Sequence, residues 1–362
     1  LDIAPQLARL KQLSGEVKGL GERAREAEQE LQELLATLPN LPDPTAAEPE
    51  DEVVRVVGDA TKRGRDHLEL AGERIDMERG ARLSGSRFAY LRGDLVMLEL
   101  ALVQWVLAKL RGKGFEPVIP PVLVREQALY GTGFLPDTEQ QIYHLPADDL
   151  YLAGTSEVAL ASLHADEILD FADLPLRYAG LSSCFRREAG SAGKDTRGIF
   201  RVHQFDKVEM FSFVDPADSA EEHERLLAIE EEIMSDLEIS YRVLNIAVDD
   251  LGASAAKKYD IEAWLPGQGR YRELTSTSNT TDFQARRLKI RVRHPAPTPE
   301  QQSPVARSQR GAETLHTLNG TAVAVGRTII ALLENGQRDD GSVVLPQVLV
   351  PYGAPPELPS AA

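Results

Sequence analysis

The chain has 362 residues, of which 42% are hydrophobic and 27% charged, a composition typical of a globular protein with enough apolar material for a core. Its 40 basic and 57 acidic residues give a formal net charge of −17, which argues against a surface coated in basic charge for nucleic acid but leaves room for a local basic patch. No apolar run approaches the roughly 20 residues that span a bilayer, and the single cysteine, Cys184, allows neither an internal disulfide nor a cysteine zinc site, so we expect a cytoplasmic protein without membrane contact or zinc.

The N-terminal segment is predicted to be a helix that carries a coiled-coil seam. From Leu10 to Leu38, apolar residues recur at alternating spacings of three and four, which is the heptad pattern. Pro39 ends the helix, because proline lacks a backbone N–H and clashes with the preceding turn. Such a seam needs a partner helix, and no second heptad run lies nearby. We therefore expect residues 1–44 to form a coiled-coil arm that is shortened or incomplete in this chain.

Residues 45–65 are acidic and irregular, so a linker or a peripheral strand is expected there. Residues 66–352 are predicted to form a compact α+β domain. The tail, residues 353–362, is rich in proline and small residues and is expected to be mobile.

Within the α+β domain, leucines at helical spacing predict a long helix over 92–112. Residues 114–121 are typical of a short strand that ends in prolines. Further strands are expected over 201–214 and 286–293, the latter from strict alternation of charged and apolar residues. The acidic segment 217–238 is predicted to be a helix with a solvated face. Strands and helices do not alternate in a βαβ rhythm, so we expect an antiparallel sheet flanked by helices.

The common signatures of phosphate-binding loops, dinucleotide folds, serine hydrolases and zinc peptidases are absent from the sequence. Instead, arginines and carboxylates occur within otherwise apolar stretches at four places: Phe185–Glu188, His203–Glu209, Tyr271–Ser276 and Gly326–Thr328. Arginine binds oxyanions bidentately, and nearby carboxylates can hold Mg²⁺ or an ammonium group. Four such clusters favour a phosphate-handling site over the alternative, which is a set of buried ion pairs within a sheet.

These clusters belong to long strings that resemble class II aminoacyl-tRNA synthetases, and within that class the bacterial type of seryl-tRNA synthetase. The string Cys184–Gly193, continuing through Asp195–Gly198 to His203–Glu209, resembles motif 2 of the family. Leu318–Thr321 with Gly326–Asn335 resembles motif 3, residues 114–121 resemble the dimer-forming motif 1, and Thr155–Glu157 resembles the serine-site segment. The resemblance extends from Pro39 to Gly353 and implies the class II fold, an antiparallel sheet flanked by helices, with a coiled-coil arm.

The resemblance also implies roles for individual residues. Arg186, Arg327 and Glu273 would be the catalytic residues, with Arg186 on the α-phosphate and the activated carboxyl group and Arg327 on the γ-phosphate. Glu273 and Ser276 would carry a Mg²⁺ ion that accompanies ATP. The other implied ATP contacts are Glu188 at the edge of adenine, Val202 through its backbone and Phe205 by stacking. The implied serine-binding residues are Thr155, Glu157, Arg186, Glu209, Asn319 and Thr321, with Glu209 on the ammonium group.

The implied function is that of a homodimeric serine–tRNA ligase, which activates L-serine with ATP and transfers it to the 3′ end of tRNA(Ser). The first step is an in-line attack of the serine carboxylate on the α-phosphorus. This step needs positioning of the reactants and neutralisation of charge. It does not need a protein nucleophile, and the sequence shows no evident one.

Two alternative functions stay open. One is a paralogue that serves a biosynthetic pathway or inhibitor resistance, since Thr277 and Thr321 stand where the family commonly has cysteine and serine. The other is an amino acid:carrier protein ligase. Such ligases resemble a group with a cysteine-bearing zinc site, which is hard to build with Cys184 alone.

Overall fold

The computed structural model of the chain describes residues 3–136, 140–189, 193, 195, 197–295 and 312–361. It divides into two compact units, Leu1–Pro39 and Asn40–Ala362. The first unit contains one helix, α1 (Ala4–Ala36), which has a proline in its first turn, where the missing N–H costs no hydrogen bond. The apolar residues of the predicted seam, among them Leu10, Val17 and Leu20, are exposed. The helix predicted before Pro39 is thus confirmed.

The second unit is built on an eight-stranded sheet. Its strands, in spatial order, are β1 (Glu52–Val57), β11 (Tyr241–Asn245), β12 (Lys257–Leu265), β13 (Arg270–Asn279), β16 (His316–Ala324), β10 (Gln204–Val214), β9 (Leu176–Phe185) and β4 (Glu116–Val118). Every neighbouring pair is antiparallel except β4 and β9, which are parallel. This confirms the predicted α+β architecture with an antiparallel sheet.

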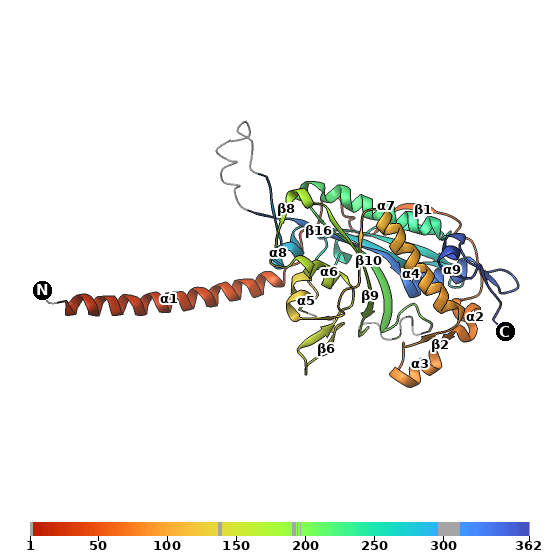
Figure 1. The fold of residues 1–362 in the computed structure, drawn as a ribbon, viewed down its shortest axis with the longest axis horizontal. Coiled ribbons are helices and arrows are strands. Elements are labelled where there is room, and N and C mark those ends of the chain that lie inside the picture. The colour runs from red at the N-terminus through yellow and green to blue at the C-terminus, as the bar shows by residue number, and fades with distance from the viewer. Residues whose placement is uncertain are drawn as a thin grey trace, which may run out of the picture. The chain divides into compact units, whose positions relative to one another are not determined.

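Three long helices, α4 (Asp94–Gly112), α7 (Ser219–Asp236) and α9 (Val325–Asn335), pack against one face of the sheet (Figure 1). Because side chains alternate along a strand, Val208 and Met210 of β10 join the core beneath these helices. The opposite face of β10 carries Phe211 and Phe213, which pack with residues of α6 (Glu157–Ala161) and α8 (Phe283–Arg287). The sheet therefore separates a main core from a second face that is only partly covered.

Smaller elements surround this framework. The short helices are α2 (His67–Ala71), α3 (Met77–Ser84) and α5 (Glu126–Thr132). The minor sheets are β15–β14–β8 (Glu313–Thr314, Arg291–Arg293, Ile168–Asp170), β5–β7–β6 (Leu123–Val124, Leu150–Leu152, Tyr143–Leu145), β2–β3 (Ile75–Asp76, Tyr90–Leu91) and β17–β18 (Val343–Val344, Glu357–Leu358). None of the helices in the described ranges combines the length and apolarity that a bilayer crossing requires.

The helix predicted over 92–112 is α4, and its leucines at helical spacing are fully buried. The strand predicted over 114–121 is β4, and that over 201–214 is β10. The prediction for 286–293 is wrong in part, because α8 continues to Arg287 and only Arg291–Arg293 pairs as a strand. The alternation itself holds: Ile290 and Val292 are buried between exposed charged residues.

The acidic segment 217–238 departs from its prediction as a solvated helix. It contains α7, which lies on the main core and buries two glutamates, Glu222 and Glu230. Glu222 accepts two hydrogen bonds from the guanidinium group of Arg177, at 2.7 and 2.6 Å, so its buried charge is paired. Glu230 accepts one from the Thr275 hydroxyl at 2.8 Å, and burial raises the pKa of Glu230 well above its usual value. A high acid content therefore does not mark this helix as solvated.

Residues 45–65 contain β1, a strand at the edge of the main sheet. The prediction of a mobile tail is wrong for residues up to Leu358. There, Glu357–Leu358 pairs with Val343–Val344, and Leu358 is 1% exposed within the main core. An apolar side chain that is removed from water this completely holds the tail in place despite its prolines.

Leu358→Ala is accordingly expected to lower the free energy of unfolding by about 2–4 kcal/mol, because it removes buried methyl groups and leaves a cavity. Leu83→Ala is the matched control, since Leu83 in α3 is 71% exposed and such substitutions change stability by about 0.5 kcal/mol or less. Urea titration of both variants measures the difference. Equal small effects at the two positions would mean that the tail is not anchored by Leu358.

Candidate active site

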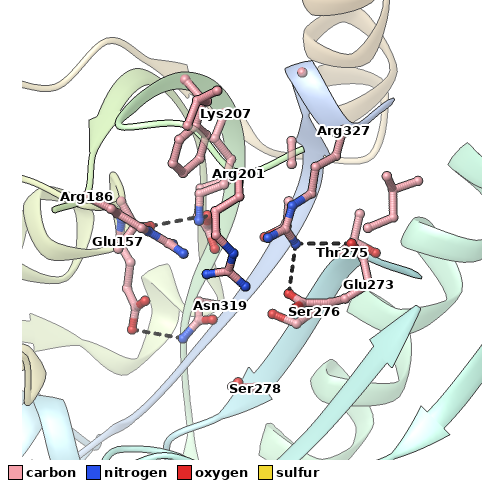
Figure 2. Close-up of a pocket in the computed structure, with 18 of the residues that line it drawn as sticks. Glu157, Arg186, Arg201, Lys207, Glu273, Thr275, Ser276, Ser278, Asn319 and Arg327 are labelled. Atoms are coloured by element: carbon pink, nitrogen blue, oxygen red, sulfur yellow. Dashed lines mark hydrogen bonds and ion pairs between the residues drawn. The ribbon is translucent and has the colours of Figure 1, made fainter. Parts of the chain in front are cut away.

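A single cavity collects every site residue predicted from the sequence. Figure 2 labels Glu157, Arg186, Glu273, Ser276, Asn319 and Arg327 among them. The predicted residues come from α6 and the turn before it, the segment between β9 and β10, the strands β10, β13 and β16, and the first turn of α9. The predicted residues that line the cavity are Thr155, Glu157, Arg186, Glu188, Val202, Phe205, Glu209, Glu273, Ser276, Asn319, Thr321 and Arg327. Segments that are more than 170 positions apart in sequence, such as Thr155 and Arg327, thus meet at one place.

One row of side chains runs along β10 in this cavity. Phe205, Lys207 and Glu209 are every second residue of β10, so they lie on the same face of the strand at intervals of about 7 Å. At one end of the row, the guanidinium carbon of Arg186 lies 5.3 Å from the centre of the Phe205 ring, within the range of a cation–π contact. Its Nε donates to the Gly154 carbonyl at 3.2 Å. The row therefore combines an aromatic platform with fixed positive charge.

The other end of the row is acidic and buried. Glu209 is 1% exposed and forms an ion pair with Lys207, which is also buried. The hydroxyl of Thr155 donates to Oε2 of Glu209 at 3.4 Å. A carboxylate this deep is stable as an anion only if a cation or hydrogen bonds compensate its lost hydration. Here Lys207 and the Thr155 hydroxyl supply that compensation for Glu209.

Glu157 lies next to this acid and is held by two amides. Its Oε1 accepts from Nε2 of Gln284 at 2.7 Å and from Nδ2 of Asn319 at 3.0 Å. Burial, together with the charge of Glu209, raises the pKa of Glu157 to about 7. Glu157 therefore exchanges a proton in the neutral pH range, and its oxygen atoms are oriented before any ligand arrives.

The raised pKa of Glu157 predicts a pH-dependent stability. Between its ordinary value of 4.5 and about 7, the folded chain binds this proton more tightly than the unfolded chain does. The contribution of this proton to the free energy of unfolding is fully present below pH 4.5. It falls as the pH rises above 4.5 and is lost once the pH has passed about 7. Glu157→Gln cannot ionise, so its stability relative to the wild type should rise by up to about 3 kcal/mol between pH 4.5 and 8. Denaturant titrations across this pH range test it, and a pH-independent difference would contradict it.

Strand β13 brings Glu273 and Ser276 to the cavity, although they are three positions apart. In a regular strand, such residues point to opposite faces. Here the register with β12 shifts between Ile261 and Glu262, whose partners are Thr275 and Glu273, so Leu274 is an extra residue. This bulge returns Glu273 to the face of Ser276, and both line the cavity while the Thr275 hydroxyl bonds to Glu230.

The donor set of Glu273 and Ser276 fits Mg²⁺, which prefers oxygen ligands and is usually held by one or two carboxylates plus phosphates. Arg327 lies beside them: its Nη1 is 3.3 Å from Oε1 of Glu273 and donates to the backbone carbonyl of Glu273 at 3.1 Å. Burial alone would raise the pKa of Glu273, but the charges of Arg327, Lys258 and Arg186 hold that pKa below its usual value. Glu273 therefore remains an anion at neutral pH.

Among the cavity residues that the sequence did not single out as site residues are three polar ones, Arg201, Lys207 and Ser278. Arg201 donates to Glu188 at 2.6 Å, so Glu188 is held by an ion pair. The buried Nε of Arg201 finds no hydrogen-bond acceptor among the residues that the structure describes, which suits an anionic ligand. Lys207 could have been found from strand alternation, because it lies two positions from both Phe205 and Glu209.

No group of three histidine, cysteine, aspartate or glutamate side chains in the described ranges is placed to hold a metal ion. Of the two departures from the family pattern, Thr321 lines the cavity and is the register partner of Glu209. Thr277 instead donates its hydroxyl to the Asn319 carbonyl and is fully buried.

Comparison with known proteins gives a consistent result. Residues 143–336 match the family model described as the tRNA synthetase class II core domain (G, H, P, S and T). A serine–tRNA ligase from Streptomyces coelicolor is 53% identical over 360 residues, which cover 96% of this chain and 81% of that protein. The crystal structure of seryl-tRNA synthetase from Pyrococcus horikoshii complexed with ATP superimposes with a TM-score of 0.92 at 41% identity, over 99% of this chain and 84% of that one.

A cytoplasmic serine–tRNA ligase from Naegleria fowleri in complex with AMP superimposes with a TM-score of 0.86 at 34% identity, over 99% of this chain and 85% of that one. Two of these proteins were thus solved with a nucleotide bound, and the similarity in each case extends over nearly all of this chain. The class II sheet, the cavity and these relatives agree, and the chain belongs to the seryl-tRNA synthetase family.

Proposed function

We propose that the chain activates L-serine with ATP and transfers it to the 3′ end of tRNA(Ser), and that the cavity over β10 is where this happens. The observation that carries the proposal is the row on β10, in which an aromatic platform and a buried acid are separated by about 13 Å, four residues of strand. An aminoacyl adenylate has a planar base at one end and an ammonium group at the other. The similarity to a curated serine–tRNA ligase and to two seryl-tRNA synthetases solved with ATP or AMP supports the same reading.

In this assignment, adenine stacks on Phe205 and its edge meets Glu188, which Arg201 holds in place. The serine carboxylate attacks the α-phosphorus in line, a bond forms between its oxygen and phosphorus, and pyrophosphate leaves. Arg186 contacts the α-phosphate and the reacting carboxyl group, while Arg327 and Arg201 neutralise the phosphates that leave. These cations are fixed before reaction by protein hydrogen bonds, so little reorganisation is needed as charge moves.

Glu273 and Ser276 would hold the Mg²⁺ that accompanies ATP. When bound, this ion supplies further neutralisation of phosphate charge. The pairing of Arg327 with Glu273 keeps the carboxylate ionised and aims the guanidinium group at the same phosphates.

The pocket around Glu209 would select serine by its polar groups rather than by size. The ammonium group pairs with Glu209, and the hydroxyl meets Glu157, Asn319 and Thr321. A substrate without the hydroxyl leaves these buried groups unpaired, which discriminates more strongly than the loss of a methyl contact does. The acyl group then passes to a ribose hydroxyl of the tRNA, the bond between the acyl carbon and the phosphate oxygen breaks, and AMP leaves.

We further propose that the protein works as a homodimer in the cytoplasm. Exposed apolar side chains on α4, namely Val96, Met97 and Leu100, and the exposed Ile119 after β4 are consistent with a contact between copies. Sedimentation at micromolar concentration should give the mass of two chains, and a monomer would contradict this part of the proposal.

The function itself is tested by ATP–pyrophosphate exchange with serine, threonine, alanine and glycine, followed by charging of tRNA(Ser). We expect exchange that is strongest with serine, and stable charging of the tRNA. Absence of serine-dependent exchange would overturn the substrate assignment. Exchange followed by acylation of a carrier protein, but not of tRNA(Ser), would favour the carrier ligase, and insensitivity to serine-like inhibitors would favour the specialised paralogue.

A further inference from the structure

Lys207 occupies a position that the roles assigned so far leave unexplained. It is buried in the cavity and forms an ion pair with Glu209, the same carboxylate that would receive the serine ammonium group. Oε2 of Glu209 is contacted by both Lys207 and the hydroxyl of Thr155. Lys207 therefore already places a cation at the carboxylate to which the substrate brings a second one.

Two ammonium groups cannot share one buried carboxylate without a penalty, because like charges a few ångströms apart repel strongly where water is excluded. The lysine side chain is a point charge on a flexible four-carbon stem, so it can swing to a new partner. A buried ammonium group that loses its counter-ion must find another anion or lose its charge. The question is which anion lies within its reach.

The position of Lys207 along β10 shows which anions lie near it. Lys207 lies midway between Phe205 and Glu209, about 7 Å from each along the strand. With adenine at Phe205 and the ammonium group at Glu209, the groups that join them are the ribose, the α-phosphate and the serine carboxyl group. The α-phosphate and the carboxylate are anionic, and they are the two groups that react. Lys207 therefore projects from the strand beneath the reacting centre.

We propose that Lys207 is a switched counter-ion, which neutralises Glu209 before serine binds and passes to the serine carboxylate and the ATP α-phosphate when serine binds. This inference rests on the proposed function and adds a regulatory step to it. Serine binding prepares the site for ATP, because it releases the cation that neutralises the reacting anions. Arg186 is already held by the Gly154 carbonyl, so in this proposal Lys207 is the cation whose position depends on serine.

The proposal predicts coupling between the two substrates. L-serine should tighten the binding of the non-reactive analogue α,β-methylene-ATP by about ten-fold in the wild type, within the usual range of binding coupling. In Lys207→Met this coupling should disappear, and kcat for serine-dependent pyrophosphate exchange should fall by about 10²-fold, as for other lost charge-stabilising groups. Lys207→Arg keeps the charge and should restore part of both.

Lys109→Met is the matched control, since Lys109 is also a largely buried, ion-paired lysine, with Glu232 and Asp236 as partners at 2.6 and 2.7 Å, but lies on α4 outside the cavity. It should keep the coupling. A complementary variant, Glu209→Gln, leaves Lys207 without its carboxylate, so the ATP analogue should bind tighter without serine. This variant decides the question if Lys207→Met does not fold.

The experiment separates the two levels of inference. If Lys207→Met retains the coupling and kcat of the wild type, or if Glu209→Gln leaves the affinity for the analogue unchanged, the switched counter-ion is overturned while the proposed function stands. If the wild type itself shows no serine-dependent exchange, the proposed function fails first.

Discussion

Arg186→Ala is expected to lower kcat/KM for serine-dependent pyrophosphate exchange by about 10³-fold, because one donor aimed at developing charge contributes factors of this size. Arg186 is the cation in contact with the Phe205 ring, and its Nε is fixed by the Gly154 carbonyl. A water molecule that fills the space left by Arg186 carries no charge, so it stabilises the phosphate less than the fixed guanidinium group does. Initial rates with serine and ATP varied separately give the measurement.

Arg187→Ala is the control for this effect. Arg187 is the next residue and is exposed, and its side chain does not line the cavity. Arg186→Lys keeps the charge but loses the planar fork, so we expect it to recover only a small part of the activity. Equal losses in Arg186→Ala and Arg187→Ala would show that general basic charge, rather than a positioned arginine, supports the reaction.

Glu209→Gln is expected to raise the KM for serine by about 10²-fold while changing the KM for ATP by a few-fold at most. Truncating one partner of a buried, hydrogen-bonded charge pair costs roughly 2–5 kcal/mol, and here the serine ammonium group bears that loss. The split between the two KM values identifies the end of the cavity where serine binds.

Glu230→Gln is the matched control, because Glu230 is fully buried but lies on the helix side of the sheet, where burial raises its pKa well above the usual value. A glutamine there has nearly the same shape as the glutamate and lies outside the cavity, so the KM for serine should stay unchanged. Equal rises of both KM values in Glu209→Gln would remove Glu209 from the serine pocket.

The sequence predicts much of this site because its residues lie in strings whose order carries the information. Phe205 and Glu209 are two steps of strand alternation apart on either side of Lys207, so their common face follows from the pattern. The leucines of α4 predict its buried face equally well. In such segments local periodicity and tertiary packing agree.

Other features depend on pairings that no local pattern reveals. The bulge at Leu274, which aligns Glu273 with Ser276, exists because β12 and β13 differ by one residue in register. The buried Glu230 is hydrogen-bonded to Thr275, which is 45 positions away in sequence. Glu157 is hydrogen-bonded to Gln284, which is 127 positions away.

The central claim is that the row on β10 holds the adenylate, with adenine at Phe205 and the amino group at Glu209. A crystal structure of the protein with a non-hydrolysable sulfamoyl analogue of seryl-adenylate tests it most directly. We expect the base stacked on Phe205, the ammonium group within about 3 Å of the Glu209 carboxylate and Lys207 turned towards the sulfamoyl linkage. An analogue bound in the reverse orientation, or outside this cavity, would contradict the account.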